Sequence, residues 1–184
     1  MKRRWIAGLM AVVCVGAMAV FTGCTGGSNE GDAEATSYML TLAFVNEQYV
    51  QTGNDALDVI IDTKMEKRFP NEREMYLQTL ELLREENIIN VSVEGDVKLT
   101  TAFASNFNIN DVTVSDGIAT VDFDGEDFSG SSTQETMLIS QIVETLTKSF
   151  DTIKGVDFTV NGEKVKTLLG HVDASTIFTQ SLYK

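Results

Sequence analysis

Large apolar residues alternate with smaller ones along residues 38–45, where Leu40, Leu42 and Phe44 fall on one side. This two-residue period predicts a β-strand. Residues 57–63, LDVIIDT, form a second run rich in β-branched side chains, and Gly53-Asn54-Asp55 between the two runs marks a turn. We expect the two runs to pair as a hairpin.

The apolar spacing changes to that of a helix after Pro70. Tyr76, Leu80 and Leu83 recur at intervals of three or four residues, which predicts a helix over residues 71–86. Asn71 is a favourable N-cap, and the acidic residues of the first turn suit the helix dipole.

Residues 110–124, NDVTVSDGIATVDFD, predict a second hairpin. Polar and apolar residues alternate on both sides of Asp116-Gly117, a dipeptide that favours a two-residue turn because glycine tolerates positive φ. A strand over residues 155–160 and a turn at Asn161-Gly162 leading into residues 163–166 predict a third strand pair.

A second helix is predicted over residues 132–150. Ser132 and Glu135 have the spacing of a capping box. A broad apolar stripe follows, made of Leu138, Ile142, Val143, Leu146 and Phe150. We expect this stripe to lie against a sheet that includes Val121, Phe123, Phe158 and Val160.

The first 24 residues have the layout of a secretory signal segment. A basic start at Lys2, Arg3 and Arg4 precedes an apolar run that ends in Phe21-Thr22-Gly23-Cys24. The ending resembles a bacterial lipobox, which predicts a signal peptide over residues 1–23 and a lipid on Cys24. Cys14 is a poorer attachment site because bulky Val13 precedes it. The alternative is an uncleaved membrane-spanning anchor, since the run is just long enough to cross a bilayer.

Charge and composition narrow the choice of partners. The chain has 14 Lys and Arg against 27 Asp and Glu, and cleavage before Cys24 would remove three basic residues and take the net charge from −13 to −16. Such a domain is repelled by nucleic acid and by anionic lipid headgroups. Residues 24–37 are rich in Gly, Ser and acidic residues, which predicts a flexible tether. A lipid on Cys24 would leave no cysteine for a disulfide or a metal site.

The chain contains one histidine, His171, two residues before Asp173. A catalytic histidine needs a nucleophile and an oxyanion pocket, and a histidine metal site needs further ligands. The sequence has no Gly-x-Ser-x-Gly motif and no second histidine. We therefore expect His171 and Asp173 to bind backbone groups where the chain turns, with Gly170 permitting a close approach, and we predict no catalytic residues.

An acidic cluster, Asp122, Asp124, Glu126 and Asp127, could be read as a calcium site. An EF-hand loop that began at Asp122 would need Gly at the position of Asp127 and Glu at the position of Thr133. The cluster is better explained as a solvated strand end that leads into a helix N-terminus. We predict no metal and no cofactor.

Four motifs in the second half resemble the GerMN domain of sporulation and spore-germination lipoproteins. They are DGIATVDFD at 116–124, ISQIVETLT at 139–147, VDFTVNGEKV at 156–165 and GHVD at 170–173. The resemblance is best over residues 112–180 and assigns residues 38–184 to one domain. It implies an α+β fold, a small mixed or antiparallel sheet with two helices on one face, similar to ring-building domains, and it implies no catalytic residues.

The expected function is therefore that of a lipid-anchored module on the outer face of the bacterial cell membrane. The module would bind or assemble proteins, including a second copy of itself, in sporulation, germination or envelope assembly. The alternative is a lipoprotein that binds a solute or a cell-wall fragment. A nucleic-acid partner and an enzymatic activity are not expected.

Overall fold

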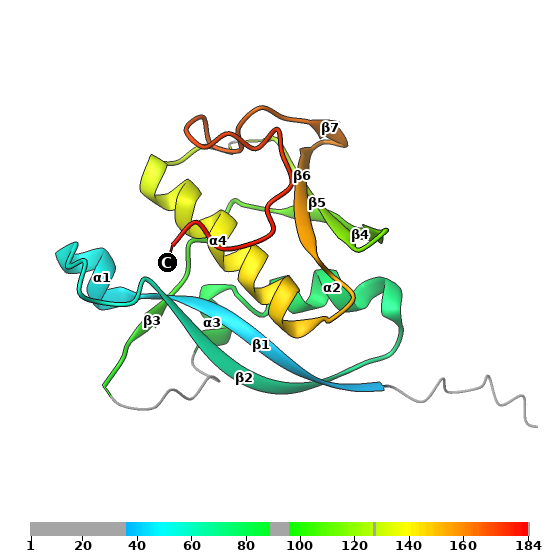
Figure 1. Cartoon of the computed structure of the whole chain (residues 1–184), viewed down its shortest axis with the longest axis horizontal. Helices are drawn as coiled ribbons and strands as arrows, with labels where there is room; N and C mark the ends of the chain where they lie inside the picture. The colour runs from blue at the N-terminus through cyan, green and yellow to red at the C-terminus, as the bar shows by residue number, and fades with distance from the viewer. Residues whose placement is uncertain (1–35, 89–95, 127, 184) are drawn as a thin grey trace, which may run out of the picture. The chain divides into compact units, whose positions relative to one another are not determined.

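The computed structural model describes residues 36–88, 96–126 and 128–183. Two β-sheets flank one long helix in this part of the chain (Figure 1). The first sheet has the strand order β2-β1-β3 and the second has the order β4-β5-β6-β7. Among the described residues, no helix has the length and apolar character needed to cross a membrane.

The first sheet confirms the predicted hairpin and extends it. β1 (Thr36–Asn46) pairs antiparallel with β2 (Ile60–Phe69), and β3 (Leu99–Thr100) joins the end of β1 on its other side. The partner strand lies later than residues 57–63, and a short helix, α1 (Glu47–Thr52), precedes the predicted turn in the connection. The Asn46 side chain caps α1, and Gly53 ends it with a φ of 61°.

The first predicted helix is shorter than expected. Asn71 caps α2 (Glu72–Glu81) by accepting a hydrogen bond from the Glu74 N–H at 3.0 Å. Tight turns follow, in which the Leu83 N–H donates to Leu80 O at 3.0 Å. The Asn87 side-chain amide donates a hydrogen bond to Glu81 O at 2.9 Å. The chain then forms α3 (Glu85–Ile88) as a separate turn of helix.

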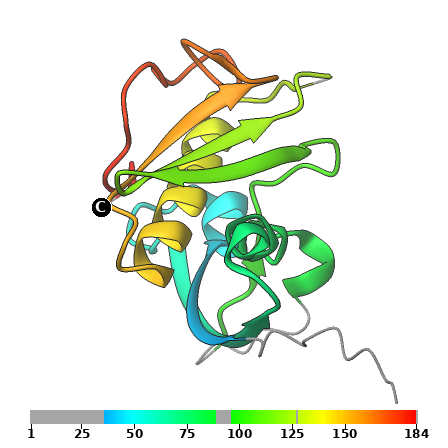
Figure 2. The ribbon, with the colours of Figure 1, turned by 90° about the vertical axis from the view of Figure 1, so that its right-hand side faces the viewer.

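The second sheet follows the predicted order. β4 (Ile109–Ser115) and β5 (Ile118–Phe123) form a hairpin in which Asp116 and Gly117 both have positive φ, and β6 (Gly155–Val160) lies parallel to β5. The short strand β7 (Glu163–Lys164) pairs with β6 after the turn at Asn161-Gly162. The helices α2 and α4 (Ser132–Ser149) lie on the same face of this sheet, so the α+β prediction is confirmed (Figure 2).

Helix α4 also packs against β1 of the other sheet. The expected stripe, including Leu138, Ile142 and Leu146, is fully buried in one cluster with Val121, Phe123 and Phe158 of the second sheet. On the other side, the Thr145 hydroxyl accepts from the Ala43 N–H at 3.0 Å. The Ser149 hydroxyl accepts from the Thr41 N–H and donates to Thr41 O, both at 2.9 Å. The helix therefore covers the backbone edge that β1 does not share with a neighbouring strand.

The capping-box prediction is wrong. The N-cap of α4 is Ser131, whose hydroxyl accepts a hydrogen bond from the Gln134 N–H at 3.2 Å. Glu135 does not turn back to the start of the helix, because its carboxylate is bound elsewhere.

Candidate functional site

The Glu135 carboxylate holds the turn that contains GHVD. Its side chain is fully buried, and it accepts four backbone N–H groups. One oxygen accepts from Leu168 and Leu169, both at 2.8 Å, and the other accepts from His171 at 2.7 Å and Val172 at 3.0 Å. Hydrogen bonds from several donors compensate the cost of burying a charged group. This glutamate therefore has a structural role. The sequence did not reveal it, because Ser132 and Glu135 also have the spacing of a capping box.

His171 lies at the surface of the same turn. Its ring Nε2 is 3.0 Å from the carbonyl oxygen of Gly130, just before α4. The expected contact between this histidine and the backbone is confirmed. The side chain is exposed, however, so the contact contributes less to stability than a buried one would.

Asp173 also binds the backbone of the turn, as expected. Its carboxylate accepts from the Ser175 N–H at 3.0 Å and from the Ser175 hydroxyl at 2.5 Å, and these hydrogen bonds lower the pKa of Asp173. The expected role of Gly170 is corrected. A side chain at this position would meet no atom within 4 Å, whereas the φ of 101° is one that other residues rarely adopt.

The acidic residues of DFDGEDF do not converge on one point. The Asp122 carboxylate accepts from the Thr159 hydroxyl at 2.6 Å and the Gly162 N–H at 2.7 Å. Partial burial raises the pKa of Asp122, but hydrogen bonds from Thr159, Asn110 and Gly162 outweigh it and hold the pKa below its usual value. Asp124 instead accepts from the Glu126 N–H at 3.1 Å. Asp127 lies outside the described residues, among which no three acidic, His or Cys side chains are grouped to hold a metal.

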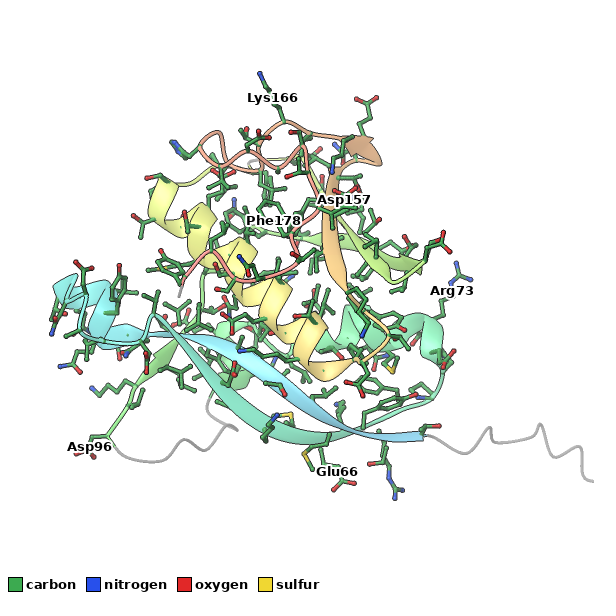
Figure 3. The ribbon with its side chains drawn as sticks, in the orientation of Figure 1. Glu66, Arg73, Asp96, Asp157, Lys166 and Phe178 are labelled. Atoms are coloured by element: carbon green, nitrogen blue, oxygen red, sulfur yellow. The ribbon has the colours of Figure 1, made fainter. Side chains whose placement is uncertain are left out.

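A groove of about 990 Å³ runs between α2, β4 and the C-terminal end of α4. We call it the α2–β4 groove. Its apolar lining is Tyr38, Met75, Tyr76, Val112, Val114 and Phe150. The rings of Tyr76 and Phe150 meet edge to face with their centroids 4.9 Å apart. Charged residues border the lining, and Figure 3 shows one of them, Arg73, pointing away from the body of the domain.

The edge strand of the second sheet forms one wall of this groove. Among the described strands, β4 pairs only with β5. Four residues of β4 line the groove: Asp111, Val112, Thr113 and Val114. The Val112 N–H donates a hydrogen bond to the carboxylate of the preceding Asp111 at 2.9 Å. Val114 occupies the next equivalent position, two residues along the strand, where the backbone N–H and C=O again face away from β5. The wall can therefore offer backbone hydrogen bonds to an added chain.

The sequence did not indicate the groove. Its walls come from four segments that are distant in the chain, and its residues have the spacing of ordinary core positions. The alternating pattern of residues 110–124 does predict a strand, but no local signal shows that this strand lies at the edge of its sheet. Cys24, the other predicted site, lies outside the described residues.

The comparisons with known proteins agree on the fold. The family model Germane, described as sporulation and spore germination, matches residues 41–166. The first GerMN domain of the sporulation protein GerM from Bacillus subtilis superposes with a TM-score of 0.55 at 18% identity, covering 78% of this chain and 97% of that one. The tandem GerMN domains of the same protein give a TM-score of 0.56 at 16% identity, covering 79% of this chain and 46% of that one.

A Clostridium perfringens protein, named only as a candidate lipoprotein, is 17% identical over 81% of this chain and 90% of its own. Its TM-score of 0.49 is too low to carry an argument. A comparison of the sequence with curated proteins gives no match. The family match covers most of the chain and includes α2, most of β1, the other strands of both sheets and three of the four motifs of the second half, ending before GHVD at 170–173. This chain belongs to the Germane family of sporulation and spore germination domains.

Proposed function

We propose that this chain is an extracytoplasmic lipoprotein whose GerMN domain binds a protein partner at the membrane surface. The proposed division of the chain is a signal peptide over residues 1–23, a tether over 24–37 and a domain over 38–184. Family membership supports a role in sporulation or germination. The basic start, the apolar run and Thr-Gly-Cys24 support the lipid anchor.

The α2–β4 groove is the proposed binding surface, and its exposed strand edge is the observation that carries the proposal. An added peptide strand gains main-chain hydrogen bonds at such an edge and places alternate side chains in neighbouring hollows. The apolar lining beside Val114 offers such a hollow. Among the described residues that line the groove, three carry a carboxylate, Glu72, Asp111 and Asp151, and one, Arg73, carries a positive charge. The preferred peptide therefore carries basic side chains.

The alternative, binding of a solute or a cell-wall fragment, is favoured by the groove volume and by the two tyrosines in its lining. A small-molecule site usually aims a few buried polar groups into an enclosed pocket. Among the described residues, every buried side-chain nitrogen or oxygen already has a hydrogen-bond partner. This makes a protein partner the better proposal.

Site-specific photo-crosslinking in intact cells tests the proposal. A photoreactive side chain at exposed Arg73, in the groove, should give a discrete adduct with another protein. The same group at exposed Lys166, outside the groove, is the matched control. Adding Val114→Asp should abolish the Arg73 adduct, because it places a charge in the apolar lining. Equal adducts from both positions, or no effect of Val114→Asp, would refute the groove as the binding surface.

A further inference from the structure

We propose that the outer edge of β2 pairs with the same edge of a second copy of this chain, antiparallel and in one register about a two-fold axis. This inference goes beyond the proposed function, because β2 lies in the other sheet and contributes no residue to the α2–β4 groove.

The hydrogen-bond pattern of β1 shows which groups of β2 face outward. The Asn46 N–H donates to Val59 O at 2.9 Å, whereas the N–H groups of Thr41 and Ala43 bind hydroxyls of α4. Even-numbered residues of β1 therefore bond to odd-numbered residues of β2. The backbone groups of the even-numbered residues point away from β1, and no other described segment binds them. These residues are Asp62, Lys64, Glu66 and Arg68.

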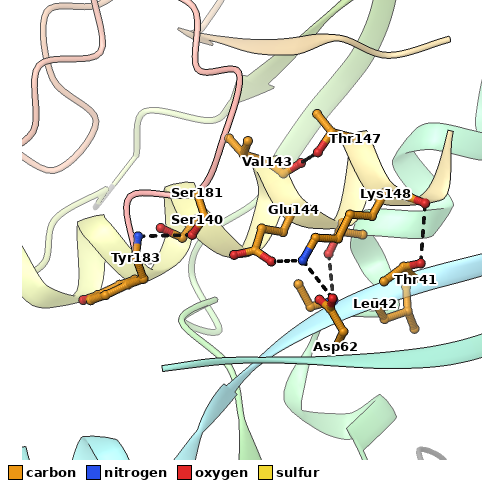
Figure 4. Close-up of polar contacts among 12 residues, drawn as sticks. Thr41, Leu42, Asp62, Ser140, Val143, Glu144, Thr147, Lys148, Ser181 and Tyr183 are labelled. Carbon is orange, nitrogen blue, oxygen red and sulfur yellow. Dashed lines mark hydrogen bonds and ion pairs between the residues drawn. The ribbon is translucent and has the colours of Figure 1, made fainter. Parts of the chain in front are cut away.

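The side chains of these four residues are exposed and alternate in charge along the edge. Asp62 forms an ion pair with Lys148 of α4 at 2.8 Å (Figure 4). Glu66 accepts a hydrogen bond from Ser37 of β1 at 2.6 Å, and Figure 3 shows it on the far side of the first sheet from α4. Intramolecular contacts thus hold several of the charges on the outer face of the strand.

One register makes this edge complementary to itself. If the two-fold axis passes beside Met65, Asp62 lies opposite Arg68 of the second copy, and Lys64 lies opposite Glu66. Symmetry repeats both pairs, so each of the four charged residues faces the opposite charge in a hydrogen-bonded position. The two Met65 side chains meet on the other face of the strands, and the three-stranded sheet continues into the second copy.

Neighbouring registers lack this match. With the axis at Lys64, that lysine faces itself and Asp62 faces Glu66. With the axis at Glu66, that glutamate faces itself and Lys64 faces Arg68. Moving the axis further shortens the paired segment or brings Lys64 opposite Pro70, which has no N–H to donate. Charged side chains commonly protect edge strands from indiscriminate pairing. Here the order of the charges opposes the two adjacent registers, and only the register with its axis at Met65 pairs all four charges with opposite ones.

Disulfide trapping measures the register directly. The full-length Met65→Cys variant is purified in detergent and oxidised over a series of protein concentrations. The parent chain, treated in the same way, gives the background of dimer formed by its native cysteines. Residue 65 meets its own copy at a non-hydrogen-bonded pair, where the Cα separation suits a disulfide. Lys67→Cys is the matched control, because residue 67 lies opposite Thr63. We expect a covalent dimer from Met65→Cys and little from Lys67→Cys.

A charge exchange tests whether the opposite charges hold the two β2 edges together. In the Met65→Cys chain, Lys64→Glu creates two like-charged pairs and should lower the dimer yield about tenfold. The double variant Lys64→Glu, Glu66→Lys restores opposite charges and should restore the yield. The proposal is overturned if Met65→Cys gives no dimer above the parent chain, if Lys67→Cys is trapped equally well, or if the double variant behaves like the single one.

Discussion

Glu135 connects the first turn of α4 to the turn at residues 168–172, which lies more than thirty residues later in the chain. Its carboxylate lies in the first turn of α4, yet its four hydrogen bonds go to residues 168–172. These hydrogen bonds fix the position of the GHVD turn. His171 adds one exposed contact, to the carbonyl oxygen of Gly130. The role that the sequence suggested for the histidine therefore belongs mainly to the glutamate.

Substitution of these two residues should have clearly different effects. Glu135→Gln replaces one acceptor oxygen with a donor and leaves two backbone N–H groups without a partner. The free energy of unfolding should fall by roughly 3 kcal/mol. His171→Ala removes one exposed contact and should cost about 1 kcal/mol or less. Urea unfolding of the two variants measures both values. An equal loss of stability in both would contradict this assignment of roles.

At the scale of elements, α4 links the two sheets in two chemically different ways. Its apolar stripe fills the core beneath β5 and β6, while the hydroxyls of Thr145 and Ser149 replace a missing neighbour strand along β1. Most side chains of the helix are consequently buried. A truncation in the stripe should therefore weaken the whole domain.

Leu146→Ala tests that conclusion. Leu146 is fully buried, and its removal should lower the free energy of unfolding by about 2–5 kcal/mol through lost burial and the cavity left behind. Thr147→Ala, one residue along and half-buried, is the matched control and should change stability by less than about 0.5 kcal/mol. Denaturant unfolding with one cooperative transition gives the comparison. A Leu146→Ala chain as stable as the Thr147→Ala chain would show that the stripe does not support the core.

At the scale of the whole molecule, local patterns predicted the elements better than their arrangement. The hairpin at Asp116-Gly117 and the cap at Asn71 depend on neighbouring residues and were found directly. The division into two sheets, the edge position of β2 and the partners of Glu135 depend on residues far apart in the chain. A Ser-x-x-Glu spacing is compatible with both a capping box and a long-range anchor, so the sequence could not distinguish them.

The lipid anchor relates the domain to its proposed place in the cell. Two acyl chains bind a membrane firmly, whereas an acidic domain alone is repelled by anionic headgroups. If Cys24 carries the lipid, attachment to the membrane depends on that one sulfur atom. The uncleaved alternative, a spanning segment, depends on the apolar run and does not require Cys24.

The mass of the membrane-bound chain is the most direct test of the proposed lipoprotein. We expect a chain that begins at Cys24 and carries a diacylglyceryl group on its sulfur. Cys24→Ser should abolish this processing, leaving either an uncleaved precursor or a chain released from the membrane fraction. A membrane-bound chain that retains residues 1–23 without lipid, or a Cys24→Ser chain that is cleaved and retained like the parent, would contradict a lipid anchor on Cys24.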